Sequence, residues 1–232
     1  MAQRLGGGLR MGFALALRTS LLLPLHNLPP MPDKLPAAFF QRPDVLAIAR
    51  ELLGKHFYTH VDGLLTGGRV VETEAYRHAG DHSLTLHLQR KRHQAQGLHV
   101  PGGRAYIYTV YDRHALFNIA THDADHPDAV LIRAIEPLVG IGEMLGRRGL
   151  AKPVRALTAG PGVLTQALGI TPALSGEPVT GPLIWFEDHG EVVAAANTVA
   201  SARVGLAYAG AEAAGLPWRF RLRDSKWTSP AR

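Results

Sequence analysis

Apolar side chains recur along this chain with two periods, and each period predicts a different kind of element. Residues 43–53 (PDVLAIARELL) carry apolar side chains at helical spacing, with a proline near the start and Gly54 beyond the end, and this pattern predicts a helix. Residues 68–76 and 104–111 alternate apolar with polar positions and are rich in Val, Ile, Thr and Tyr, as strands are. The same criteria predict strands at 129–135, 182–186, 199–205 and 218–222 and helices at 137–145 and 161–168.

The order of these elements limits the fold class. Strands and helices do not alternate regularly enough for a doubly wound parallel sheet. We therefore expect a single domain of the mixed α+β class over residues 31–232, with a largely antiparallel sheet and flanking helices.

The first 30 residues differ from the rest. Residues 11–25 are apolar and follow Arg4 and Arg10, as in a signal peptide. However, Arg18 interrupts the apolar stretch and no small-residue cleavage site follows it, and the uninterrupted pieces are too short to span a bilayer. We expect residues 1–30 to be a disordered or mis-assigned extension, and we expect no membrane partner.

Composition excludes several classes of site and suggests one class of partner. The chain has no cysteine, so a disulfide scaffold, an iron–sulfur cluster and a thiolate nucleophile are ruled out. The formal charge is +6, and 20 of the 25 basic residues are arginines. Arginine suits bidentate contacts with phosphate, so a nucleic-acid partner is one interpretation, and a codon bias toward arginine is the other.

Two glutamates on one predicted strand are the first candidates for chemistry. In VVETEAY (70–76), side chains two residues apart share a face, so Glu72, Glu74 and Tyr76 point the same way. A partly buried carboxylate there could activate water as a general base. The alternative, which the pattern alone favours, is an exposed strand face with two solvated glutamates.

Three tyrosines mark a second strand, RAYIYTVY (104–111). Tyr106 and Tyr108 share one face, and Tyr111 lies at the end of the strand beside Arg113. Core packing would explain them, as would a surface on which nucleic-acid bases stack. A tyrosine at a turn could also insert as a wedge between base pairs.

A third group of polar residues lies within residues 78–99 and suggests a zinc site. Its members are His78, Asp81, His82, His87, His93 and His99. Their spacings match no standard ligand pattern, and the cationic residues 90–92 would oppose cation binding. We expect a mobile, basic loop here and no metal.

The remaining polar candidates have ordinary structural interpretations. Asn118 and Arg133 lie on or near predicted strands, where each would normally be a satisfied polar residue or a surface residue. Four basic side chains within residues 219–226 predict a solvated edge strand.

Six segments of the chain form a more specific pattern when they are taken together. In order they are LPAAFFQRP (35–43), RVVETEAY (69–76), YIYTVY (106–111), LIRAIEPLVG (131–140), AGPGVLTQALGI (159–170) and ARVGLAYAG (202–210). This set resembles the alkyladenine DNA glycosylase family, also called 3-methyladenine or methylpurine DNA glycosylases, over residues 35–229. The resemblance implies one compact domain with a curved, mostly antiparallel sheet and neither metal nor organic cofactor.

The resemblance also implies a role for each matching residue. Glu74 would deprotonate the attacking water, and Arg133 would help to hold it. Tyr76 and Tyr108 would stack on the two faces of the extruded base, and Tyr111 would fill the gap left in the duplex.

Recognition of the base involves two further positions. Asn118 matches the asparagine that screens purines bearing a 2-amino group. His82, followed by Ser83, is the best match to the histidine that contacts the base, and His87 is the second choice. The segments before and after this histidine depart from the family pattern, so the substrate range stays open.

The expected function is therefore a monofunctional DNA glycosylase of base excision repair. Its partner would be double-stranded DNA containing damaged purines, and it would act as a monomer in the cytoplasm, associated with the nucleoid if the organism is prokaryotic. No lysine lies in the matching segments, so no Schiff-base step is expected. Two rivals remain: a non-catalytic nucleic-acid-binding module, and a His-rich metallohydrolase built on residues 78–99.

Overall fold

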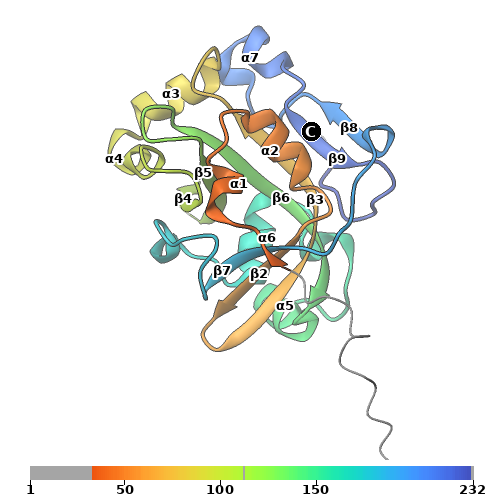
Figure 1. Cartoon of the computed structure of the whole chain (residues 1–232). Coiled ribbons are helices and arrows are strands. Elements are labelled where there is room, and N and C mark those ends of the chain that lie inside the picture. Colours follow the sequence, from red (N-terminus) through yellow and green to blue (C-terminus); the bar gives the residue numbers. More distant parts are fainter. Residues whose placement is uncertain (1–32, 112, 231–232) are drawn as a thin grey trace, which may run out of the picture. The chain divides into compact units, whose positions relative to one another are not determined.

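The computed structural model describes residues 33–111 and 113–230 (Figure 1). The expectation for residues 1–30 lies outside this range. Within the described residues, no helix combines the length and the apolar character needed to cross a membrane.

A single sheet forms the centre of the described fold. Its strands are β1 (Asp33–Lys34), β2 (His56–Val61), β3 (Leu64–Tyr76), β4 (Arg104–Val110), β5 (His114–Thr121), β6 (Asp128–Val139), β7 (Ile184–Asp188), β8 (Thr198–Ser201) and β9 (Arg219–Leu222). They lie in the order β1-β7-β2-β3-β6-β5-β4, with β9 between β3 and β8. The pairings described are all antiparallel. The predicted α+β domain with a mostly antiparallel sheet is confirmed.

Strand β3 organises the sheet because it has three partners. It pairs with β6 along most of its 13 residues, while its other edge is shared by β2 in the first half and β9 in the second. Register shifts against β6 occur on both sides of Glu72, and such irregularities bend a strand and increase its twist. Strand β3 thereby brings its glutamates against β9 and the residues that follow β9.

Short helices cover the sheet. They are α1 (Ala37–Phe40), α2 (Val45–Glu51), α3 (His82–Arg90), α4 (Arg92–Ala95), α5 (Ile141–Arg148), α6 (Pro161–Leu168) and α7 (Ala211–Gly215). Helix α2 begins where Asp44 accepts a hydrogen bond from the Ala47 amide at 3.0 Å, a normal N-cap. Helices α2 and α6 form where the sequence predicts them.

The helix predicted at 137–145 is wrong in its first part. Residues 137–139 continue strand β6, and α5 begins only at Ile141. Between them Gly140 adopts a φ of +68°, and a Cβ there would lie 2.2 Å from the carbonyl oxygen of Leu65. Only glycine fits both the backbone conformation and this close approach, so the strand ends and the helix begins at this residue.

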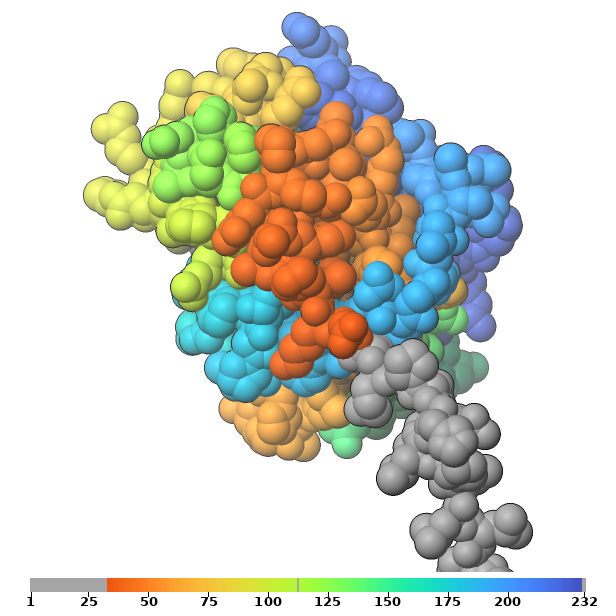
Figure 2. Space-filling view, viewed as in Figure 1, coloured from red at the N-terminus to blue at the C-terminus, as the bar shows by residue number. Residues whose placement is uncertain are grey.

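The segment predicted to be a mobile loop also folds differently, because it contains α3 and α4. Asp81 caps α3 by accepting from the Ser83 amide at 3.0 Å. Leu84 and Leu98 are buried and form a second hydrophobic cluster with Tyr106. In Figure 2 the α3 segment (yellow) lies next to the α7 segment (blue).

The main core contains an aromatic stack that fixes the sheet beneath the site. The ring of Phe57 is 4.5 Å from that of Phe186 and 4.9 Å from that of Phe117. Since neighbouring side chains on a strand point to opposite faces, the burial of Phe117 in this core turns Asn118 toward the other face.

Candidate active site

A cavity of about 660 Å³ lies between α3, strands β3 to β6 and residues 204–208. Its polar and aromatic lining residues are Tyr76, Ser83, His87, Lys91, Tyr106, Tyr108, Thr109, Tyr111, Asn118, Arg133 and Tyr208. Six of the residues expected at the site thus line one cavity or its mouth: Tyr76, Tyr108, Tyr111, Asn118, Arg133 and the second-choice histidine, His87.

The two glutamates of β3 are not solvated, contrary to the interpretation that the pattern alone favours, because both side chains are 0 % exposed. Glu72 accepts four hydrogen bonds: from Arg133 Nε at 2.8 Å, Arg219 Nε at 2.7 Å, Ser229 Oγ at 2.7 Å and the Ser229 amide. Burial alone would raise the pKa of Glu72, but the two guanidinium groups and the Ser229 hydrogen bonds hold it below its ordinary value. Three of these four bonds end on Oε1, and two of the partner residues, Arg219 and Ser229, do not line the cavity. Glu72 therefore has a structural role.

Glu74 is contacted by three donor groups, one fewer than Glu72. It accepts from the Val204 amide at 2.9 Å and from the Tyr76 hydroxyl at 2.8 Å, and it pairs with Arg133 Nη1 at 3.2 Å. All three partners line the cavity. Glu74 therefore lies directly behind the cavity wall with one acceptor position left for a water molecule.

Arg133 of β6 connects the two glutamates. Its guanidinium pairs with Glu72 through Nε and with Glu74 through Nη1. Burial would lower the pKa of Arg133, but the two carboxylates outweigh it and raise that pKa. Arg133 is therefore not a surface residue, one of the two ordinary interpretations of its sequence position. It is a buried cation that orients both carboxylates.

Aromatic rings form another part of the cavity lining, apart from Arg133 and the glutamates behind it. The Tyr106 and Tyr108 rings lie 5.5 Å apart, and the His87 ring lies 4.6 Å from Tyr108. Burial is the main cause that raises the pKa values of Tyr76, Tyr106 and Tyr108, so their hydroxyls stay protonated. Burial, with the nearby Lys91 charge, lowers the pKa of His87 to about 4. The ring wall is therefore uncharged at neutral pH.

Comparison with known proteins identifies the family. Residues 38–226 match the family model described as methylpurine-DNA glycosylase. The chain is 41 % identical to a Chlamydia felis protein over 194 residues, which is 83 % of this chain and 97 % of the relative. It is 39 % identical over 197 residues to a Methanoculleus marisnigri protein, covering 84 % and 98 % of the two chains. Both relatives carry 3-methyladenine DNA glycosylase in their names.

This chain belongs to the methylpurine-DNA glycosylase family. The match includes every strand of the sheet except β1 and all the residues that line the cavity.

Tyr111, the residue predicted to act as a wedge, lines the cavity and is exposed. It follows β4 at the mouth of the cavity, and its side chain is 85 % exposed. Its φ of +50° is in the left-handed region, which is uncommon for residues other than glycine and marks functional sites. The wedge role stays a prediction, and the exposed ring is consistent with it.

The structure does not bring the first-choice histidine to the site. His82 is exposed at the start of α3 and does not line the cavity, whereas His87 does. Five residues correspond to about 500° of helical rotation, so the two side chains leave α3 on different sides. His87 Nε2 lies 2.7 Å from the Tyr106 hydroxyl. Of the two histidines, only His87 is therefore placed to contact a molecule in the cavity.

A metal centre at the cavity is not supported by the arrangement of side chains. Of the five histidines within residues 78–99, only His87 lines the cavity. Among the described residues, the one group of three metal-binding side chains within reach of one another is His122, Asp123 and His126. None of these three lines the cavity, so they cannot serve a reaction there.

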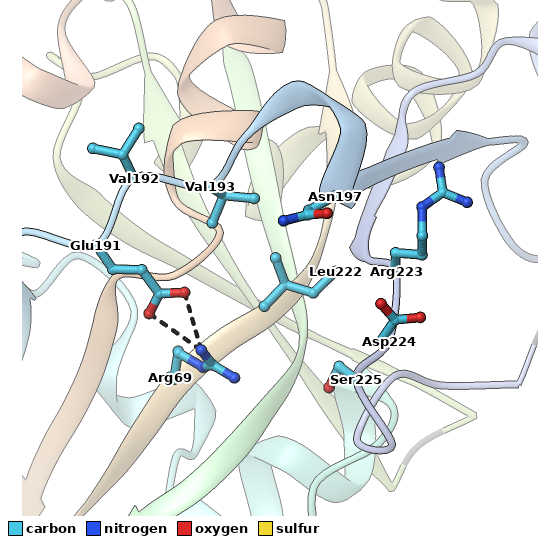
Figure 3. Close-up of a pocket in the computed structure, with 9 residues that line it drawn as sticks. All are labelled: Arg69, Glu191, Val192, Val193, Asn197, Leu222, Arg223, Asp224 and Ser225. Carbon is cyan, nitrogen blue, oxygen red and sulfur yellow. Dashed lines mark hydrogen bonds and ion pairs between the residues drawn. The ribbon is translucent and has the colours of Figure 1, made fainter.

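A second, smaller hollow of about 260 Å³ lies beside β9 (Figure 3). Its most prominent charged group, Arg69, is held by Glu136 at 2.7 Å and by Glu191 at 3.0 Å. Neither Glu74 nor any of its three partners lines this hollow, so it is not part of the candidate site around Glu74.

Several residues that support the site escape sequence reasoning. Arg219 is buried in an ion pair with Glu72 rather than exposed on an edge strand, since β9 pairs with β3 and β8. Asp81 and Arg203 form a second buried ion pair. The sequence gives only a weak signal for these ion pairs: a charged residue lies within a predicted strand or beside an apolar segment.

Proposed function

We propose that this protein is a monofunctional DNA glycosylase of base excision repair that removes damaged purines of the 3-methyladenine type from double-stranded DNA, acting as a monomer. The family membership supports the reaction class. The environment of Glu74 supports its assignment as the general base. It is a buried carboxylate with one unused acceptor position, and its three partners all line a tyrosine-rich cavity.

The cavity suits a purine extruded from the duplex. Tyr76 and Tyr108 both line it, and stacking on an aromatic side chain contributes about 1–3 kcal/mol per base. Aromatic faces attract cationic rings, and a purine alkylated at N3 or N7 is cationic. Extrusion costs a few kcal/mol and least for a damaged base, which favours lesions over normal nucleotides.

Glu74 would take a proton from the water held at its remaining acceptor position. The water oxygen then bonds to C1′ of the sugar while the bond from C1′ to the base breaks, and its electron pair leaves with the base. The negative charge of Glu74 also stabilises the oxocarbenium-like sugar. An alkylated base leaves as a neutral molecule, so it needs little help from a general acid.

Asn118 would limit which purines enter. Its Nδ2 donates to the carbonyl oxygens of Tyr106 at 3.2 Å and Leu116 at 3.3 Å. The amide is therefore fixed in the cavity wall, where a 2-amino group on the base would meet it. This arrangement supports the screening role implied by the family.

The test is release of free base from a duplex carrying 3-methyladenine, with and without EDTA. We expect base release at the same rate in both conditions and no strand cleavage. Binding without release would indicate a non-catalytic DNA-binding module, and loss of activity with EDTA would indicate a metallohydrolase. Either result would contradict the proposal.

A further inference from the structure

A fully buried ion pair lies behind the cavity wall. Arg203 donates to both carboxylate oxygens of Asp81 through Nη1 and Nη2, and both side chains have no exposed surface. Arg203 also donates to the carbonyl oxygens of Ala75 at 2.9 Å and Ala213 at 3.3 Å. Burial would raise the pKa of Asp81, but hydrogen bonds from Arg203 and Ser83 hold it below its ordinary value, so the pair is ionic.

This pair covers the back of a base-stacking ring. The guanidinium carbon of Arg203 lies 4.6 Å from the centroid of the Tyr76 ring. Tyr76 lines the cavity, whereas Arg203 is buried and does not line it. One face of the ring therefore meets the guanidinium, and the opposite face is left for a base.

The pair also joins the two sides of the site. Asp81 caps α3 by accepting from the Ser83 amide and hydroxyl, and α3 carries His87. The residue after Arg203 is Val204, whose amide donates to Glu74 at 2.9 Å. One ion pair thus positions the helix that faces the base and the loop that holds the carboxylate.

The charge of the pair bears on which bases can bind. A base stacked on Tyr76 would lie about 8 Å from the Arg203 charge, since the guanidinium carbon is 4.6 Å from the Tyr76 ring and carbon atoms in contact are about 3.5–4.0 Å apart. At an effective dielectric constant of about 20, one unpaired charge at that distance disfavours a cationic base by roughly tenfold to thirtyfold. The negative charge of Asp81 cancels most of this repulsion.

We propose that Asp81 is a specificity-determining residue: by neutralising Arg203 behind Tyr76, it allows the cavity to accept cationic alkylated purines as well as neutral damaged ones. The inference rests on the proposed glycosylase function. It goes beyond that function because it names a residue outside the cavity that sets the preference between charged and neutral bases.

The variant Asp81→Asn tests this inference because it removes the charge but keeps the shape, and asparagine also caps helices well. Single-turnover release of 3-methyladenine, a cationic base in DNA, is compared with release of hypoxanthine, a neutral one. We expect the ratio of the two rates to fall about tenfold or more. Asp44→Asn is the matched control, because Asp44 caps α2 in the same way and should leave the ratio unchanged.

Two further variants separate the charge from the fold. The double variant Asp81→Asn/Arg203→Gln removes both charges and should return the ratio close to that of the unaltered protein. Arg203→Gln alone leaves the Asp81 charge and should shift the ratio toward the cationic base. Replacing a buried pair with neutral partners is tolerated better than leaving one charge unpaired. If Asp81→Asn fails to fold, the ratio in Arg203→Gln compared with that in the double variant still tests the inference.

The outcomes distinguish the two proposals. If both bases are released more slowly by the same factor in Asp81→Asn, and Arg203→Gln leaves the ratio unchanged, the pair is only structural and this inference is overturned while the glycosylase function stands. If the unaltered protein releases neither base, the proposed function itself fails.

Discussion

Replacing Glu72 by glutamine is expected to damage the fold, although Glu72 stands beside Glu74, the proposed general base. The substitution keeps the shape of the side chain but removes a buried negative charge that two guanidinium groups share, at 2.8 Å from Arg133 and 2.7 Å from Arg219. An amide nitrogen in place of one carboxylate oxygen also faces a hydrogen-bond donor, either an arginine nitrogen or the Ser229 amide. Breaking a buried ion pair by removing one partner costs about 3–5 kcal/mol.

For a domain of this size, each kcal/mol corresponds to about 2–4 °C in melting temperature. Glu72→Gln should therefore lower the melting temperature by roughly 6–20 °C, measured by circular dichroism at pH 7. Glu51→Gln is the control, because Glu51 pairs with Arg42 at a half-exposed position and should change stability by less than about 0.5 kcal/mol. A Glu72→Gln protein as stable as the unaltered one would refute the structural role of Glu72.

Two more predictions concern the aromatic part of the site. Tyr111→Ser should slow base release from duplex DNA far more than release from a single-stranded substrate, because a wedge acts on extrusion and does not touch the sugar; equal losses on both substrates would exclude the wedge. His87 has a pKa of about 4 in the folded protein and an ordinary value near 6.5 when unfolded, so the unfolded state binds more protons between these values. Stability should therefore fall by up to about 3 kcal/mol as the pH drops from 6.5 to 4, and His87→Gln should reduce this fall in urea titrations. An identical pH dependence in both proteins would contradict the buried, neutral state of His87.

The sheet could be predicted well from the sequence where local pattern decides the structure. Strands β3 and β4 alternate clearly, and both form where expected. The sequence pattern ends strand β6 at residue 135, because Pro137 resembles the start of a helix. In the structure Pro137 lies opposite Gly68, and the strand continues to Val139. Strands β2 and β5 carry weaker alternation and were missed.

Helix α3 shows how histidines can mislead a sequence interpretation. Its possible metal ligands favour a loop interpretation, which does not account for the capping role of Asp81 or the burial of Leu84. Once the helix is known, its rotation decides that His87, and not His82, reaches the cavity.

The burial of the glutamates could not be predicted from local sequence. Arg219 and Ser229, which bind Glu72, are 147 and 157 residues away along the chain. The resemblance to the glycosylase family indicates Glu74, rather than Glu72, as the general base that deprotonates the attacking water. The structure supplies a physical reason for that preference, since all three partners of Glu74 line the cavity, whereas Arg219 and Ser229, which hold Glu72, do not.

The central claim is that Glu74 activates the attacking water. Its most direct test is the single-turnover rate of base release by Glu74→Gln, measured together with the affinity for a duplex carrying an uncleavable lesion analogue. We predict a loss of about 10²–10⁴-fold in rate, the usual contribution of a general base, with nearly unchanged affinity. A Glu74→Gln protein that releases base at the unaltered rate would contradict the account.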